Sequence, residues 1–170
     1  YNGYTVLLIL DHYPLRSIRD IGVLPGAAFR DAFIDLRWLN AGPISLNDIE
    51  HTVLRARLAE PRIHFAIVCA SASCPVLRAE AFRTDTLDAQ LDDAARAFVR
   101  DPSRNRYDAA TQTLWLSAIF DWFGEDFVKA AGSVPAYVAR FADDEMAAAI
   151  RDGDIRVRYL DYDWALNQTP

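Results

Sequence analysis

The chain has 170 residues and a mass of 19.1 kDa, the usual size of one domain. A composition of 52% hydrophobic and 25% charged residues excludes intrinsic disorder. The 24 acidic residues outnumber the 18 basic ones, and the net charge of −6 argues against a surface for nucleic acid or anionic lipid. The longest apolar stretch near the start, Val6 to Leu10, is far shorter than a membrane span. We therefore expect residues 1–170 to form a single domain without a membrane span.

The first part of the chain predicts a helix followed by a long connection. Tyr1 to Leu10 indicates a buried helix that ends before Pro14, because proline disfavours helical geometry in the preceding residue. Its β-branched residues leave a strand as the alternative. Since the chain opens inside this element and not on methionine, we expect it to start within its domain, as a fragment or a processed form. Arg16 to Ile44 is predicted to be loop-rich, with three aromatic anchors, Phe29, Phe33 and Trp38.

A second helix is predicted to begin at Ser45. The Ser45 hydroxyl can cap the free amides of the first turn, and Asp48 follows three residues later with a favourable charge. The helix should stop before Pro61, and its apolar face should contain Leu46, Ile49, Val53 and Ala56.

The best strand candidate lies in the middle of the chain. Arg62 to Cys69 is apolar on both faces, as expected of a central strand covered on both sides. A loop of small residues, Ala70 to Ser73, then leads to Cys74. Pro75 suits the first position of a helix, so Val76 to Phe82 is predicted to be helical.

The second half combines helices with short strands. Apolar residues at helical spacing mark a helix from Leu87 to Phe98, and Tyr107 to Leu116 is typical of a β-hairpin. Ile155 to Tyr159 alternates as a strand with one wet face does. Three more helices are predicted at Ile119 to Ala130, Val134 to Phe141 and Glu145 to Ile150. The predicted fold class is α+β, with helices packed around a small, mainly antiparallel sheet.

Cys74 is the first candidate for chemistry. It would lie at the N-terminus of the helix predicted after it, where free amides and the helix dipole stabilise a thiolate. A thiol prepared in this way is a common nucleophile. An inert, buried thiol is an equally good interpretation of the sequence alone.

The second cysteine, Cys69, ends the predicted strand and is interpreted as buried structure. A Cys69–Cys74 disulfide can form if the loop turns back and brings the two Cα atoms within about 7 Å. Together with His64, these cysteines do not match the spacing of common zinc sites, so no metal is predicted. The sequence contains no Gly-rich phosphate loop and no common hydrolase motif, and we expect no cofactor.

A thiol nucleophile needs a base, and the candidates are His64 and His51. Five strand residues at about 3.3 Å each would place His64 roughly 17 Å from Cys69, so Cys74 would have to return along the strand to meet it. His51 escapes that constraint because it lies on the helix that starts at Ser45. Its neighbour Glu50 is near the apolar face and, if buried, needs a partner; an exposed carboxylate is the alternative. The alternative role for His64 is that of a hydrogen-bonded histidine in the core. We select His64 over His51 as the base because a strand is a more rigid platform.

The end of the chain alternates acidic and aromatic residues. In an extended segment Asp161 and Asp163 share one face, and Tyr162 and Trp164 share the other. The two carboxylates can orient a histidine, hold a helix end or pair with arginine. In this arginine-rich chain the ion pair is the simplest interpretation.

Six short motifs occur in order along nearly the whole chain: Tyr1-Asn2 with Thr5, His12-Tyr13-Pro14, Ser45-Leu46 to Ile49-Glu50-His51, Arg62-Ile63-His64-Phe65-Ala66, Cys69-Ala70-Ser71 to Ser73-Cys74-Pro75, and Asp161-Tyr162-Asp163-Trp164 to Leu166-Asn167. Together they resemble the domain of unknown function 547 family of bacteria, plants and animals. The family's domain begins a little earlier, with an aromatic-rich helix that ends in the Tyr-Asn pair.

The family pattern includes the Glu50-His51 pair, His64 and Cys74, and in many members also the position of Cys69. By analogy of residue types, this set resembles the site and fold of a cysteine peptidase or transglutaminase. Many bacterial members are exported, so the resemblance implies a periplasmic or secreted location. The plant members point instead to intracellular interaction roles.

These observations predict a thiol-dependent enzyme that acts by acyl transfer or hydrolysis on a small-molecule or peptide substrate. Cys74 would be the nucleophile and His64 the base, with Glu50 or Asp163 orienting the imidazole ring. In the alternative, a redox or partner-binding module, Cys74 forms mixed disulfides with glutathione or a glutaredoxin-like protein, and Cys69 resolves them. A third interpretation is a scaffold whose polar residues only hold the core.

Overall fold

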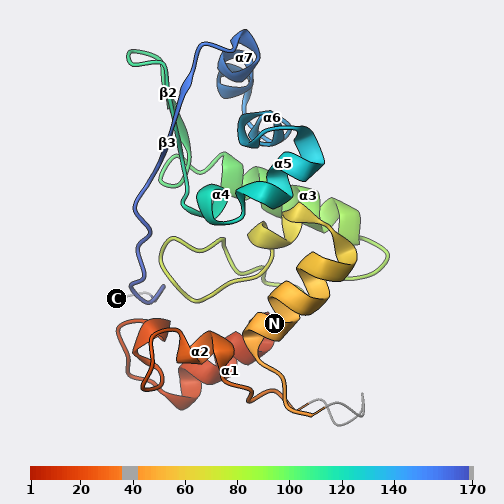
Figure 1. The fold of residues 1–170 in the computed structure, drawn as a ribbon, viewed down its shortest axis with the longest axis vertical. Helices are drawn as coiled ribbons and strands as arrows, with labels where there is room; N and C mark the ends of the chain where they lie inside the picture. The colour runs from red at the N-terminus through yellow and green to blue at the C-terminus, as the bar shows by residue number, and fades with distance from the viewer. Residues whose placement is uncertain (36–41, 169–170) are drawn as a thin grey trace.

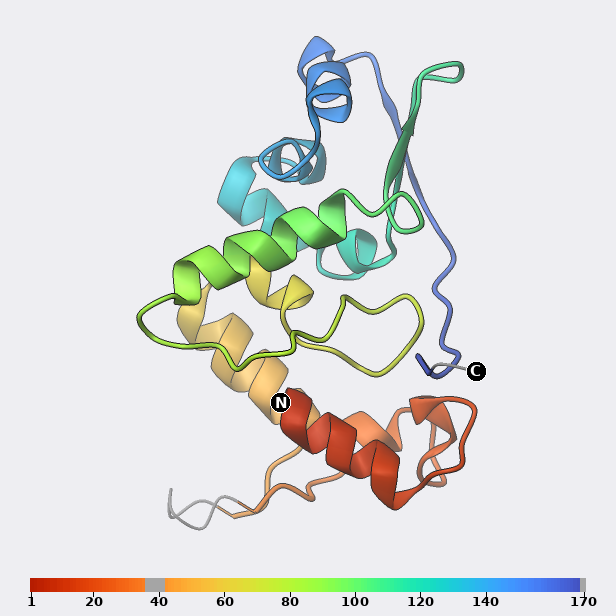
Figure 2. The ribbon, with the colours of Figure 1, turned by 180° about the vertical axis from the view of Figure 1, so that it is seen from behind.

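The computed structural model describes residues 1–35 and 42–168. In Figure 1, α1 (Asn2–Asp11) and α2 (Ala27–Arg30) lie at one end of the molecule, and α6 (Val134–Val138) and α7 (Asp144–Asp152) lie at the other. Each end has its own cluster of buried apolar side chains. After β3 (Arg156–Tyr159) the chain runs back along the molecule towards the N-terminal end, as Figures 1 and 2 both show. This closing segment links the two ends.

The first predicted helix is confirmed as α1, but it is buried on one face only. Thr5, Leu8 and Ile9 face the core, whereas Leu7 and Leu10 are exposed, Leu10 by 63%. The helix is apolar nearly all round, yet it lies at the edge of the N-terminal cluster. The apolar composition of this helix therefore predicts more burial than the structure shows.

Within residues 16–35 and 42–44, the described parts of the connection, the chain is loop-rich, as predicted. It contains η1 (Ile18–Asp20) and the short α2. Phe29 packs against Trp164 with ring centroids 6.4 Å apart, and Phe33 packs at the same distance against Tyr4. The third predicted anchor, Trp38, lies outside the described residues.

The helix start at Ser45 is confirmed in atomic detail. The Ser45 hydroxyl accepts a hydrogen bond from the Asp48 amide at 3.1 Å, and the Asp48 carboxylate accepts one from the Ser45 amide at 2.8 Å. The helix η3 (Asp48–Leu58) has π-type turns, which close on the fifth residue and are wider than α-turns. Its buried positions therefore differ from those expected at α-helical spacing: Glu50 is buried, and Val53 and Ala56 are exposed.

The predicted central strand from Arg62 to Cys69 is wrong. Its first half is a 3-10 helix, η4 (Pro61–Phe65), which Pro61 opens and which Glu60 caps by accepting a hydrogen bond from the Arg62 amide at 3.0 Å. The segment is buried on several sides because η4 packs against both α3 (Leu87–Val99) and α5 (Gly124–Ala131). A short apolar run buried all round does not distinguish a helix from a strand.

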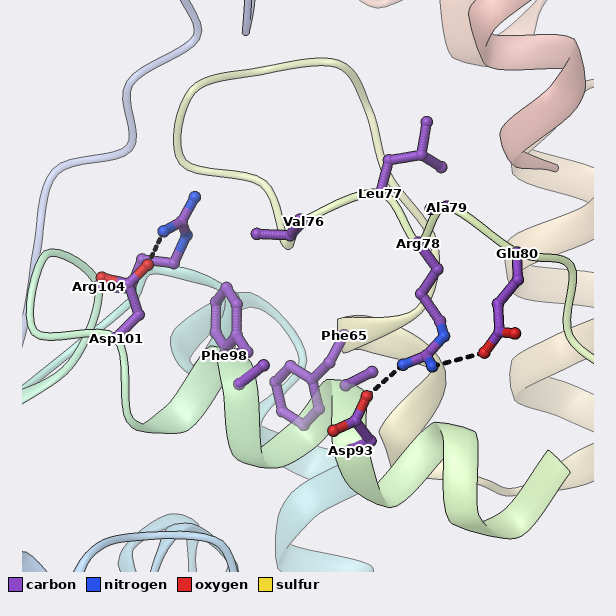
Figure 3. A pocket seen from close by; sticks show the side chains of 12 residues that line it. Phe65, Val76, Leu77, Arg78, Ala79, Glu80, Asp93, Phe98, Asp101 and Arg104 are labelled. Carbon is purple, nitrogen blue, oxygen red and sulfur yellow. Dashed lines mark hydrogen bonds and ion pairs between the residues drawn. The ribbon is translucent and has the colours of Figure 1, made fainter. Parts of the chain in front are cut away.

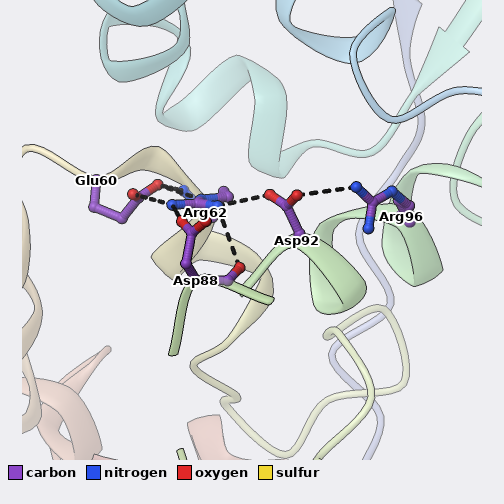
Figure 4. A network of polar contacts seen from close by, with 5 residues as sticks. All are labelled: Glu60, Arg62, Asp88, Asp92 and Arg96. Atoms are coloured by element: carbon purple, nitrogen blue, oxygen red, sulfur yellow. Dashed lines mark hydrogen bonds and ion pairs between the residues drawn. The ribbon is translucent and has the colours of Figure 1, made fainter. Parts of the chain in front are cut away.

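Arg62 fastens η4 to α3 through the ion-pair network drawn in Figure 4. Its guanidinium contacts the carboxylates of Glu60, Asp88 and Asp92 at 2.7, 2.7 and 2.6 Å. Asp92 is shared with Arg96 at 2.9 Å. The three carboxylates neutralise the charge of the Arg62 side chain, which is only 17% exposed. These ion pairs hold η4 against α3.

The helix predicted from Val76 to Phe82 is also wrong, because residues 75–83 form neither helix nor strand. The Arg104 guanidinium donates to the carbonyls of Ala72 and Cys74 at 3.1 and 2.8 Å, and Arg78 is paired with Asp93 on α3. These long-range contacts hold the segment in an irregular path. Cys74 therefore does not lie at a helix N-terminus.

The remaining elements follow the prediction more closely. The helix α3 and the hairpin of β1 (Arg106–Asp108) and β2 (Thr113–Leu116) are confirmed, while the helix predicted from residue 119 is divided at Phe123 into α4 (Ile119–Trp122) and α5. β2 lies between β1, which is antiparallel to it, and β3, which is parallel. The sheet is thus mixed, because the helices between β2 and β3 form a crossover long enough for parallel pairing.

No helix within the described residues is long and apolar enough to cross a membrane.

Phe65 is the central aromatic residue of the larger core, at 1% exposure, and its ring stacks on that of Phe98 at 5.0 Å. Phe65→Ala should lower the free energy of unfolding by about 3–5 kcal/mol, because it removes buried area and leaves a cavity. Chemical denaturation measures the effect. The matched control is Val23→Ala at a side chain that is 98% exposed, where a change within about 0.5 kcal/mol is expected.

Candidate functional site

Most of the predicted site residues line one small cavity of about 190 Å³. Glu50 and His51 come from η3, His64 from η4, and Cys69 and Cys74 from the loop that follows. The rest of the wall is largely aromatic and includes Tyr1, Phe29, Trp122, Phe123, Tyr162 and Trp164. The cavity thus brings the two cysteine sulfurs together with imidazole and carboxyl groups.

His64 and Cys74 reach the same cavity because the chain between them is compact. The 17 Å that an extended strand would impose does not apply, since η4 is a tight helix. After η4 the Asn2 side chain clamps the backbone: it donates to the carbonyl of Ala66 at 2.8 Å and accepts from the amide of Val68 at 2.9 Å. The Cys74 amide then donates to the Ser71 carbonyl at 3.0 Å, which turns the loop back.

The two cysteines form a disulfide, with their Cα atoms 6.3 Å apart. The Cys69 amide donates to Cys74 Sγ at 2.9 Å, and the Tyr162 hydroxyl lies 3.2 Å from each sulfur. Cys74 is 3% exposed and Cys69 is half-buried. Cys74 is therefore covalently paired, and it carries a free thiol only after reduction.

The imidazole of His64 is held by a carboxylate that sequence analysis did not identify. Its Nε2 lies 2.9 Å from Asp126 Oδ2, and Asp126 also accepts two hydrogen bonds from Arg55, at 2.7 and 3.1 Å. The ring of Phe123 stacks on the imidazole, with centroids 4.0 Å apart and planes 19° from parallel. These contacts fix the orientation of a histidine whose side chain is 1% exposed.

The protonation states in this group follow from burial and from charge. Burial lowers the pKa of His64 to about 4, although the Asp126 carboxylate opposes this shift. Hydrogen bonds, first from Arg55 and then from His64, lower the pKa of Asp126 to about 2. At neutral pH Asp126 is an anion that only accepts hydrogen bonds, so Nε2 of neutral His64 carries the proton and Nδ1 keeps its lone pair.

The neighbouring pair from η3 is arranged differently. Glu50 is buried, which decides between the two alternatives that the sequence left open, and its partner is Tyr1, whose hydroxyl lies 3.4 Å from the carboxylate. Burial raises the pKa of Glu50. His51 is exposed, and its Nδ1 accepts a hydrogen bond from Arg55 at 3.2 Å, so the lone pair of that nitrogen is already engaged.

Asp163 does not line the cavity. Its side chain is exposed and accepts a hydrogen bond from the Ala165 amide at 2.8 Å, while its own amide donates to the Ser73 hydroxyl at 2.9 Å. The alternation predicted for this segment is present, because Tyr162 and Trp164 are half-buried and Asp161 and Asp163 are exposed. Neither Asp163 nor Glu50 is the group that hydrogen-bonds to His64; Asp126 is. The sequence predicts Asp126 only as a residue inside the helix from Ile119 to Ala130; its place in the first turn of α5 follows from the break at Phe123.

Four larger hollows in the described part of the chain are lined by neither cysteine nor histidine. Figure 3 shows one of about 540 Å³ beside α3, with Phe65 and Phe98 in its wall. Its charged rim is paired internally, Arg78 with Asp93 and Arg104 with Asp101. A groove of about 1000 Å³ is lined mainly by aliphatic side chains. The candidate site residues thus line the smaller cavity and not the larger hollows.

The described part of the chain has no group of three or more His, Cys, Asp or Glu side chains arranged to hold a metal ion.

A family model described as a protein of unknown function, DUF547, matches residues 1–99. The chain therefore belongs to this family. The matched region contains Glu50, His51, His64 and both cysteines, whereas Asp126 and Tyr162 lie beyond it. No curated protein and no solved structure matches the chain, so these comparisons do not support a peptidase-like or transglutaminase-like fold.

The lowered pKa of His64 predicts a pH-dependent stability. Between about pH 6.5 and pH 4 the unfolded chain binds a proton that the folded chain does not, so the free energy of unfolding falls as pH falls through this window. His64→Gln should reduce the loss between pH 7 and pH 4 by about 3 kcal/mol. Urea denaturation at both pH values tests this.

The control is His12→Gln, which changes an exposed histidine outside the cavity. If the free energy of unfolding of His64→Gln depends on pH as that of the wild type does, the claim that His64 is buried and neutral in the folded protein is wrong.

Proposed function

We propose that this domain is a thiol-dependent enzyme that acts by acyl transfer or hydrolysis, with Cys74 as its nucleophile. The observation that carries the proposal is the His64–Asp126 hydrogen bond at 2.9 Å in the wall of the cavity that also holds Cys74. A base oriented by a carboxylate beside a thiol is the arrangement that nucleophilic catalysis requires.

His64 is favoured over His51 as the base by its hydrogen bonds. Because Nε2 of His64 donates to Asp126, Nδ1 remains free to accept a proton. The corresponding atom of His51 is occupied by Arg55. In the reduced protein a Cys74 thiolate adds a negative charge to the cavity, which raises the pKa of His64 and favours a thiolate–imidazolium pair.

The disulfide defines a resting, oxidised form. Two molecules of a small thiol reduce it: the small thiols are oxidised to their own disulfide, and Cys69 and Cys74 become thiols. The Cys74 sulfur then attacks the carbonyl carbon of an amide or thioester, and His64 returns its proton to the leaving group. Water, or a second acceptor, cleaves the resulting thioester with His64 as base and restores the thiol.

The dimensions of the cavity suit the end of a small-molecule or peptide substrate rather than a whole one. We also propose a periplasmic or secreted location, which the Cys69–Cys74 disulfide supports because disulfides persist in oxidising compartments.

The proposal is tested by the pH dependence of Cys74 alkylation in the reduced, folded protein. Iodoacetamide should react well below pH 8.5, the value for a free thiol, and His64→Ala should slow the reaction at pH 6.5 by about tenfold or more. The matched variant His51→Ala should stay within about twofold of the wild type. Mass spectrometry follows the rate.

The proposal that Cys74 is an activated nucleophile would be contradicted if all three proteins react as ordinary thiols do, or if Cys74 resists alkylation after reduction.

The second candidate function is a thiol redox module, and the Cys69–Cys74 disulfide itself favours it. Cys74 would attack an oxidised partner such as glutathione disulfide, release one glutathione thiolate, and be resolved by Cys69.

Cys69→Ser distinguishes the two functions. In a redox module it should trap the mixed disulfide on Cys74, which mass spectrometry detects after exposure to oxidised glutathione. Cys74→Ser, with Cys69 intact, is the control and should accumulate much less adduct. For an acyl-transfer enzyme the Cys69→Ser protein should instead keep its turnover of amide or thioester substrates.

A further inference from the structure

We propose that Tyr162 is the positioning residue of the cysteine pair: its hydroxyl donates a hydrogen bond to Cys74 Sγ and stabilises the thiolate that forms when the disulfide is reduced. This inference deepens the proposed function, because it assigns the group that sets the reactivity and the redox potential of the same site. Tyr162 lies outside the region that the family model matches.

The geometry around the sulfurs carries the argument. The Tyr162 hydroxyl is 3.2 Å from Cys74 Sγ and equally far from Cys69 Sγ, but Cys74 Sγ is also approached by the Cys69 amide at 2.9 Å. Two donors thus converge on Cys74. From the sequence we expected a helix N-terminus to stabilise the Cys74 thiolate, but no helix begins at this position. In our proposal the two donors stabilise the thiolate instead.

Tyr162 is fixed by the same loop that carries the cysteines. The next residue, Asp163, exchanges hydrogen bonds with Ser73: its amide donates to the Ser73 hydroxyl at 2.9 Å, and its carbonyl accepts from the Ser73 amide at 3.2 Å. The ring packs against both Trp122 and Trp164, with centroids 4.8 and 4.6 Å away. The hydroxyl is therefore held against the sulfurs from both the backbone and the ring.

The phenol remains a donor across the range in which a thiol titrates. Burial raises the pKa of Tyr162, an effect that its interaction with Ser71 partly opposes. The ionisable groups around it are Tyr1, Glu50, His51 and His64 in the cavity and Arg104, which donates to the carbonyl of Cys74. None of them removes the hydroxyl proton near neutral pH.

The chemical step is the reduction described above. Two molecules of a small thiol are oxidised to one disulfide, and the S–S bond of Cys69 and Cys74 is replaced by two thiols. Cys74 then loses its proton to His64 or to water. The negative charge left on Cys74 Sγ accepts the hydrogen bond from Tyr162, whose own proton stays on oxygen.

The first test measures iodoacetamide alkylation in the Cys69→Ser background, where Cys74 is the remaining cysteine. Adding Tyr162→Phe keeps the ring and removes the donor, so the pH profile should move upwards and the rate at pH 6.5 should fall about tenfold. Tyr159→Phe, three residues earlier in β3, is the matched control and should leave the profile unchanged.

The second test uses both cysteines and measures the reduction potential against a glutathione buffer at pH 8, where Cys74 is ionised. Losing a donor to the thiolate destabilises the reduced form, so Tyr162→Phe should lower the potential by about 30 mV for a tenfold effect. A purely structural role would change thermal stability without moving the pH profile or the potential.

Each outcome decides the inference. It is overturned if Tyr162→Phe matches Tyr159→Phe in both the alkylation profile and the potential. In that case the proposed function still holds if His64→Ala slows the alkylation of Cys74. Conversely, if Tyr162→Phe moves both measurements while His64→Ala moves neither, Tyr162 is confirmed and the His64 mechanism fails. Should Tyr162→Phe not fold, 3-fluorotyrosine at position 162, a stronger donor, should shift both measurements in the opposite direction, and no shift would refute the inference.

Discussion

The carboxylate of Asp126 joins three elements that are far apart in the sequence. It receives Arg55 from η3 and His64 from η4, and it lies itself in the first turn of α5. A partly buried carboxylate is stable only when its charge is matched, and the guanidinium of Arg55 provides the match. With Asp126 anionic, His64 can stay neutral and still have a fixed tautomer. The same contacts therefore hold the elements together and prepare the proposed base.

The path of residues 60–74 brings the candidate site residues of this segment to one cavity. Arg62 ties η4 to α3 at one edge, and Asn2 clamps the backbone just beyond it. A strand over the same residues would have separated His64 from the cysteine loop. The compact path brings His64 and Cys74 to the walls of one cavity. The geometry of the candidate site is thus a consequence of how this short segment is packed.

The end of the chain completes the site from the other side. The Ala72 amide donates to the Ala165 carbonyl at 2.8 Å, and the Leu166 amide donates to the Arg16 carbonyl at 2.7 Å. This segment therefore crosses both the cysteine loop and the N-terminal end of the molecule. It also supplies Tyr162, which lies against both sulfurs. The thiol chemistry proposed for residues 64–74 depends on groups that come more than fifty residues later.

Local patterns in the sequence are enough to predict several features of the fold. The cap at Ser45, the apolar period of α3, the β1–β2 hairpin and the alternation around Tyr162 depend on residues within a few positions of each other. The sequence also singled out Glu50, His51, His64 and Cys74, which share the cavity. Tertiary structure decided the form of residues 61–83, the disulfide and the choice of Asp126 as the partner of His64. Those outcomes depend on contacts such as Arg104 with Cys74 and Arg55 with Asp126, between groups thirty or more residues apart, which no local pattern specifies.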